Sequence, residues 1–102
     1  MTKNELKAGV LALLAGGANW TQNATARDVN GVPVPSGSDA AVKWDLHGAI
    51  LKTLGYTRDF RGYHELLDDI YAQIKPGAWR RNIDIDLYND QHTWAEVAAL
   101  LA

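Results

Sequence analysis

The chain has 102 residues, no cysteine, ten basic and twelve acidic residues, and a formal charge of −2 at neutral pH. This length fits one domain, and the lack of cysteine excludes disulfides, thiolate nucleophiles and zinc sites built on cysteine. The small acidic excess gives no support to general binding of nucleic-acid phosphates, while a 47% hydrophobic fraction favours a folded core over disorder.

The first predicted element is a helix over residues 3–15. Thr2 and Glu5 have the spacing of a capping box, and apolar residues follow at helical intervals. Glu5 and Lys7 interrupt the apolar segment that a signal peptide would need, and that segment is too short to span a bilayer. We therefore expect a cytoplasmic protein that has no membrane partner.

A β-hairpin is predicted next. Asn30-Gly31 favours a type I′ turn, because both central residues of that turn need a positive φ. The turn would join strands at about 24–29 and 32–34. Pro33 cannot donate a ladder hydrogen bond, so the second strand is expected at a sheet edge.

Two amphipathic helices should follow the hairpin. Ser38 is the expected N-cap of the first, which would run to Leu54 with Val42 in its apolar stripe. Gly55 is expected to adopt the αL conformation beyond its end. A connection over 56–61 leads to the second helix, predicted over 62–75.

The last third of the chain contains an alternating segment and a capping box. Strict alternation of apolar and acidic residues over 83–87 predicts a half-buried strand, with a loop over 88–92. Thr93 and Glu96 then open a final helix. The chain should form one α+β domain over 1–102, with three to four helices packed on a short antiparallel β-hairpin.

The residues able to bind metal or perform catalysis form no complete site. His47, His64 and His92 are isolated and are interpreted as structural. Asp84 and Asp86 would point the same way on the predicted strand, with Asp90 nearby, but the spacing does not fit an EF-hand loop. No serine-nucleophile elbow or Gly-rich phosphate loop is present. We expect no metal and no cofactor, and favour a protein without catalytic activity.

The four tryptophans fall into two groups. Trp44 and Trp94 are expected in the core, where an aromatic side chain buries about 150–250 Å². Trp20 and Trp79 lie in loop-like segments beside polar residues, and Trp79 is followed by Arg80. Exposed tryptophan and arginine are typical of binding hot spots, so these two positions are candidates for a partner surface.

Three motifs carry a resemblance to a known family. They are Trp20-Thr21-Gln22 with Ala26-Arg27-Asp28 and Gly31, then Trp44-Asp45-Leu46-His47-Gly48-Ala49, then Tyr88-Asn89-Asp90 with Thr93 and Glu96-Val97. Together they resemble an uncharacterised family of short bacterial and tailed-phage proteins. Asp45 and Tyr88 stand where the family pattern has cysteine and tryptophan. The resemblance implies no known activity. If the cysteine of the family pattern is a nucleophile in relatives, its replacement by Asp45 argues against an enzyme here.

These observations lead to one favoured function and two alternatives. The favoured function is a non-enzymatic protein-binding module of phage or mobile-element type, whose partner is another protein and not a nucleic acid. Its candidate binding residues are Trp20, Gln22, Arg27, Asp28, Trp79, Arg80, Asn89 and Asp90. One alternative is a small-ligand-binding or enzymatic domain with a polar pocket of Asp45, His47, Asn89 and Asp90. The other is a structural accessory protein that works as a homodimer.

Overall fold

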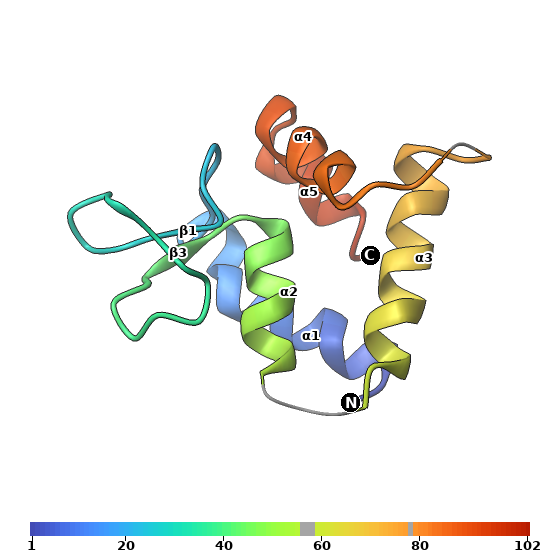
Figure 1. The fold of residues 1–102 in the computed structure, drawn as a ribbon, viewed down its shortest axis with the longest axis horizontal. Helices are drawn as coiled ribbons and strands as arrows, with labels where there is room; N and C mark the ends of the chain where they lie inside the picture. The colour runs from blue at the N-terminus through green and yellow to red at the C-terminus, as the bar shows by residue number, and fades with distance from the viewer. Residues whose placement is uncertain (56–58, 78) are drawn as a thin grey trace.

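A computed structural model describes residues 1–55, 59–77 and 79–102 and shows an α+β fold (Figure 1). Within these residues the helices are α1 Lys3–Leu14, α2 Leu46–Leu54, α3 Arg61–Ile74, α4 Asn82–Gln91 and α5 Trp94–Ala99, with a 3₁₀ turn, η1, at Ala15–Gly17. The strands are β1 Ala26–Arg27, β2 Pro33–Val34 and β3 Lys43–Trp44. The predicted fold class is confirmed, with five helices in place of three to four.

Helix α1 begins at the predicted capping box. The Thr2 hydroxyl accepts a hydrogen bond from the Glu5 amide at 3.1 Å, and the Glu5 carboxylate accepts one from the Thr2 amide at 3.2 Å. Leu6, Val10 and Leu14 form a fully buried stripe at intervals of four residues. The predicted bounds are therefore correct to within one residue.

The three strands form a small antiparallel sheet in the order β2-β1-β3. Ala26 pairs with Val34 on one side and with Trp44 on the other. Pro33 lies on an edge strand, as predicted. Gly31 has φ +80°, but Asn30 does not have a positive φ, so the predicted type I′ turn is wrong. The loop is longer than two residues, because the Asp28 amide donates to the Val32 carbonyl at 2.9 Å. The paired segments are shorter than predicted, and the third strand was not foreseen.

The predicted start of the second helix is wrong. Helix α2 begins at Leu46, and its N-cap is Asp45. Ser38 instead accepts the Ala40 amide within a turn. Residues 43–44 are extended because the Trp44 amide donates to the Asn19 carbonyl at 2.8 Å, a contact that joins distant segments. Val42 thus lies outside the helix and is 41% exposed. Gly55 has a positive φ of 65°, but its ψ of −145° lies outside the αL region.

The predicted strand over 83–87 and loop over 88–92 are also wrong, because residues 82–91 form helix α4. Asp84 stabilises the first turn by accepting the Arg81 amide at 2.9 Å. Ile85 is 1% exposed whereas Ile83 is 52% exposed, so the two isoleucines lie on opposite faces. Ile85 and Asn89 share the buried face at a spacing of four residues, which the strand interpretation overlooked.

The core lies between the helices. Helix α1 packs on α2 and α3, and α4 packs on the same two helices. Figure 1 shows the strands on one side of the molecule and α3 on the other, with α4 and α5 together along a third edge. Trp44 is buried and Trp94 packs against the core, as predicted. Helix α3 matches its predicted bounds to within one residue. Residues 56–58 of the predicted connection lie outside the described residues.

No helix in the described part of the chain combines the length and the apolar character needed to cross a membrane.

Candidate functional site

Asn89, on the buried face of α4, is the centre of a polar cluster. Its side-chain oxygen accepts hydrogen bonds from the Trp20 indole at 2.7 Å and from the Leu46 amide at 3.0 Å. Its amide nitrogen donates to the Thr21 carbonyl at 3.1 Å. One side chain therefore joins the loop before β1, the start of α2 and the last turns of α4.

The loop before β1 also satisfies the C-terminal end of α4. The Gln22 side chain donates to the carbonyl oxygens of Asn89 and His92 at 3.0 and 2.9 Å. The Asn23 amide donates to the Asp90 carboxylate at 2.8 Å. The last carbonyls of a helix have no partner within the helix, so these contacts stabilise the end of α4.

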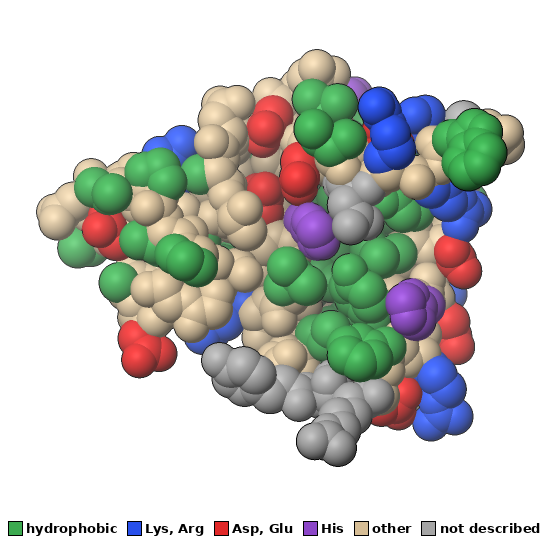
Figure 2. Space-filling model, viewed as in Figure 1, with side chains coloured by type: hydrophobic (Ala, Val, Ile, Leu, Met, Phe, Trp, Pro, Cys, Tyr) green, Lys and Arg blue, Asp and Glu red, His purple; other side chains and the backbone are tan. Residues whose placement is uncertain are grey.

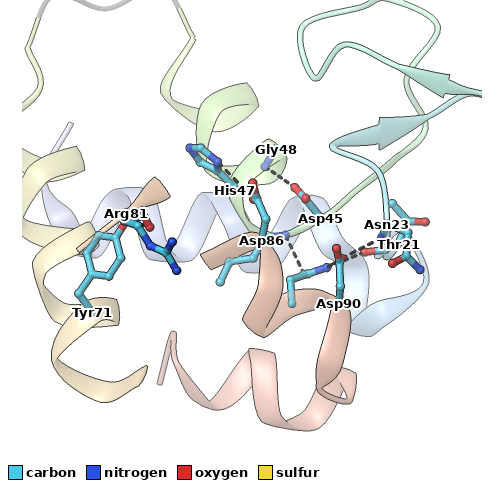
Figure 3. Close-up of polar contacts among 11 residues, drawn as sticks. Thr21, Asn23, Asp45, His47, Gly48, Tyr71, Arg81, Asp86 and Asp90 are labelled. Carbon is cyan, nitrogen blue, oxygen red and sulfur yellow. Dashed lines mark hydrogen bonds and ion pairs between the residues drawn. The ribbon is translucent and has the colours of Figure 1, made fainter. Parts of the chain in front are cut away.

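Asp45 lies beside this cluster as the N-cap of α2 and is 3% exposed. Its carboxylate accepts the Gly48 amide at 2.6 Å. Burial raises the pKa of Asp45 to about 7, the Gly48 hydrogen bond opposes that rise, and Asp86 and Asp90 add to it by charge repulsion. Figure 3 shows Asp86 and Asp90 on the part of α4 that faces Asp45.

His47 extends the cluster along α2. Its Nδ1 lies 3.5 Å from the Asp86 carboxylate, and its ring is largely shielded from solvent. Asp84 does not join this group, because it binds Arg81 and Lys75 on another side of α4. Among the described residues, no three histidine or acidic side chains are arranged to hold a metal ion.

Arg27 and Asp28 organise the hairpin. The Arg27 guanidinium donates to the Thr21 hydroxyl at 3.0 Å and to the carbonyl oxygens of Gly31 and Gln22 at 2.9 and 3.0 Å. Asp28 accepts the Asn30 and Val32 amides, both at 2.9 Å. Both side chains therefore hold nearby backbone in place. Asp28 fixes the hairpin turn, and Arg27 joins the hairpin to the loop at residues 21–22.

The cluster is an internal support. Its polar groups bind one another, and the described residues contain no buried side-chain nitrogen or oxygen that lacks a hydrogen bond. Trp20 is half-buried, with its ring 6.0 Å from that of Trp94. The structure thus brings together Trp20, Gln22, Asp45, Asn89 and Asp90, five of the predicted residues, around contacts within the protein.

Trp79 lies elsewhere and is 91% exposed. It follows a Pro76-Gly77 turn, in which Gly77 has φ +71°. Arg80 next to it binds the Asp68 carboxylate at 2.6 Å, and its guanidinium lies 5.5 Å from the centre of the Tyr71 ring. Figure 2 shows a hydrophobic projection flanked by Lys and Arg side chains at this corner of the molecule.

The residues that hold this corner were not among the predicted site residues. The Tyr71 hydroxyl donates to the Arg81 carbonyl at 2.9 Å, and Asp84 accepts from Arg81 and Lys75 at 3.0 and 3.2 Å. Asp84 three residues after Arg81 has the spacing of an acidic N3 residue. That signal was available, but the alternating pattern was interpreted as a strand.

No curated protein and no solved structure matches the chain. A family model described as a family of unknown function, DUF6197, matches residues 6–102. This match covers all three motifs on which the predicted resemblance was based and confirms it at the level of a family of unknown function. The chain belongs to the DUF6197 family.

Proposed function

We propose that this protein is a non-enzymatic protein-binding module and that Trp79 is its anchor residue. The observation that carries the proposal is the 91% exposure of this indole. Trp79 makes no hydrogen bond or ring contact within the part of the chain that the structure describes. Nothing in the described part of the structure therefore accounts for a tryptophan at this position.

The residues that follow Trp79 favour binding by this side chain. The Arg81 amide donates to Asp84 and the Arg81 carbonyl accepts from the Tyr71 hydroxyl, so the backbone two residues after Trp79 is held before a partner arrives. An anchor that is already positioned loses less conformational entropy on binding. Tryptophan and arginine are also the residues most enriched among those that dominate binding energy.

The charge around Trp79 indicates the kind of partner. Arg80 and Arg81 directly follow Trp79 in a stretch without acidic residues, although the whole chain has a net charge of −2. We propose a protein partner with an apolar pocket and an acidic rim, since complementary potentials favour docking. The phage or mobile-element association depends on the resemblance alone and stays a prediction.

The other predicted binding residues have a different part in this proposal. Trp20, Gln22 and Asn89 bind one another inside the protein, so replacing them would disturb the fold as well as any surface. Trp79 separates the two effects because its side chain supports no contact in the described structure. It is therefore the residue on which the proposal is tested.

The experiment compares three immobilised proteins: wild type, Trp79→Ala and Val29→Ala. Val29 is a matched control because it is 83% exposed at the tip of the hairpin. A partner is expected to bind wild type and Val29→Ala and to be lost, or bound at least tenfold more weakly, by Trp79→Ala. All three should unfold at the same temperature within about 2 °C, as surface substitutions usually do.

Equal binding of a purified partner by wild type and Trp79→Ala would refute the proposal. Light scattering over a range of concentrations tests the homodimer alternative. A dimer that persists in Trp79→Ala would favour a structural accessory protein, while a dimer that dissociates in this variant would make a second copy the partner.

A further inference from the structure

A cleft of about 330 Å³ lies between the end of α3 and one face of α4. Lys75 and Asp84 line one part of it, Tyr88 and His92 another, and Ile74 contributes an apolar surface. This volume is within the range of small-molecule sites, which combine apolar walls with a few polar groups.

The aromatic wall of the cleft is rigid. The Tyr88 and His92 rings stack with centres 3.6 Å apart and planes within 10°. His92 Nδ1 donates to the Tyr88 carbonyl at 2.7 Å, and Gln22 holds the His92 carbonyl at 2.9 Å. Because Tyr88 and His92 are already held in place, an aromatic ring that packs against them would order few side chains on binding.

The polar part of the cleft favours an anion. The Asp84 carboxylate accepts from the Arg81 amide, the Arg81 guanidinium and the Lys75 ammonium at 2.9, 3.0 and 3.2 Å. Lys75 lines the cleft, whereas Arg81 lies outside its lining and pairs with the same carboxylate. Two cations therefore share Asp84, which leaves an excess of one positive charge. An ammonium group has three N–H donors, and Lys75 directs one of them to Asp84.

We propose that this cleft binds a small aromatic carboxylate. The carboxylate would pair with Lys75, and the ring would lie against Tyr88 and His92. This site is separate from the proposed function, because it uses none of the surface of Trp79. The same chemistry occurs in a free aromatic acid and in a chain that ends in an aromatic residue.

The test is an amide chemical-shift titration of the whole protein with a matched series of probes. 3-Phenylpropionate carries both groups, 3-phenylpropionamide lacks the charge, and propionate lacks the ring. The first is expected to bind at least tenfold more tightly than the other two, with shifts centred on residues 74–75 and 84–92. A tetrapeptide that ends in phenylalanine is titrated in the same way. Tighter binding of the tetrapeptide than of 3-phenylpropionate would identify the ligand as a chain terminus, and tighter binding of 3-phenylpropionate would identify it as a free acid.

Two variants test whether Lys75 binds the carboxylate of the ligand. Lys75→Met keeps the length of the side chain and should weaken 3-phenylpropionate binding at least tenfold. Lys52→Met, the control, removes an exposed lysine that lines a different cleft and should change nothing. Equal affinity for the acid and the amide, or an affinity unchanged by Lys75→Met, would overturn the proposal. Trp79→Ala should bind the acid normally, so this site and the protein-binding surface can fail independently.

Discussion

The Trp20 indole and the Asn89 side chain share a 2.7 Å hydrogen bond across 69 positions of sequence. The same Asn89 oxygen accepts the Leu46 amide at 3.0 Å. The three sequence motifs therefore meet at one atom: the first supplies an indole, the second a helix N-terminus and the third the acceptor. Together, the three motifs join the sheet side of the molecule to α4.

Asn89→Ala should destabilise the protein strongly. The substitution leaves the Trp20 indole, the Leu46 amide and the Thr21 carbonyl without their partner. Each buried polar group left unsatisfied costs about 1–3 kcal/mol, so we expect a loss of about 3–5 kcal/mol in the free energy of unfolding. Urea denaturation measures this loss.

Asn4→Ala is the matched control, because Asn4 is exposed on α1. It should change the free energy of unfolding by less than about 0.5 kcal/mol. If Asn89→Ala costs no more than this control, the hydrogen bonds around Asn89 do not support the fold.

The contrast between α1 and α4 shows which parts of the fold were predictable. Helix α1 carries its own signals, a capping box and a stripe spaced by four residues, and these act within a few residues of sequence. The position of the hairpin turn is equally local, because Gly31 supplies a positive φ there, although Asn30 does not adopt the type I′ conformation that was predicted. Helix α4 was mistaken for a strand because both interpretations bury Ile85 and the alternating pattern was given more weight than the N3 spacing of Asp84. In the structure α4 packs against α2 and α3.

In the candidate site, too, features set by local sequence were predictable and features set by distant contacts were not. The motifs named Trp20, Gln22, Asn89 and Asp90, but the residue types could not show that these side chains bind one another. The start of α2 was missed because Trp44 pairs with Asn19, a contact that no local pattern records. The exposure of Trp79 was predictable because the Pro76-Gly77 turn precedes it closely.

Gly48→Ala should destabilise the start of α2. A Cβ at Gly48 would overlap the carbonyl oxygen of Thr25, which accepts the Asp45 amide at 3.1 Å. Backbone cannot move aside as cheaply as a flexible side chain, so we expect a loss of about 1–3 kcal/mol in thermal or urea denaturation. Gly37→Ala is the control, because a Cβ there meets nothing within 4 Å. Equal stability of the two variants would contradict the close packing at Gly48.

Asp45 should make the protein less stable as the pH rises from about 4 to about 7. The pKa of Asp45 is raised from 3.8 to about 7 by burial, so the folded protein binds a proton in this range that the unfolded chain has released. The folded state is favoured while that proton is present, and the advantage is lost as the pH passes the raised pKa. The full effect is on the order of 4 kcal/mol.

Asp45→Asn isolates this effect. Asparagine is a good N-cap and stays neutral, so it can accept the Gly48 amide without a buried charge. The stability difference, variant minus wild type, should be most positive above pH 7 and should shrink toward pH 4. Taking the difference removes contributions from Glu5, Asp69 and Glu96, whose lowered pKa values act in the opposite direction. A difference that does not change with pH would show that Asp45 titrates normally.

The two isoleucines of α4 provide a direct test of its helical conformation. On a strand, Ile83 and Ile85 would share one face and would respond alike to truncation. In the helix, Ile85 is 1% exposed and Ile83 is 52% exposed. Ile85→Ala should therefore cost about 2–4 kcal/mol in urea denaturation, whereas Ile83→Ala should cost less than about 1 kcal/mol. Similar losses for both substitutions would favour the strand, and would also remove the geometry that places Asn89 and Asp86 against α2.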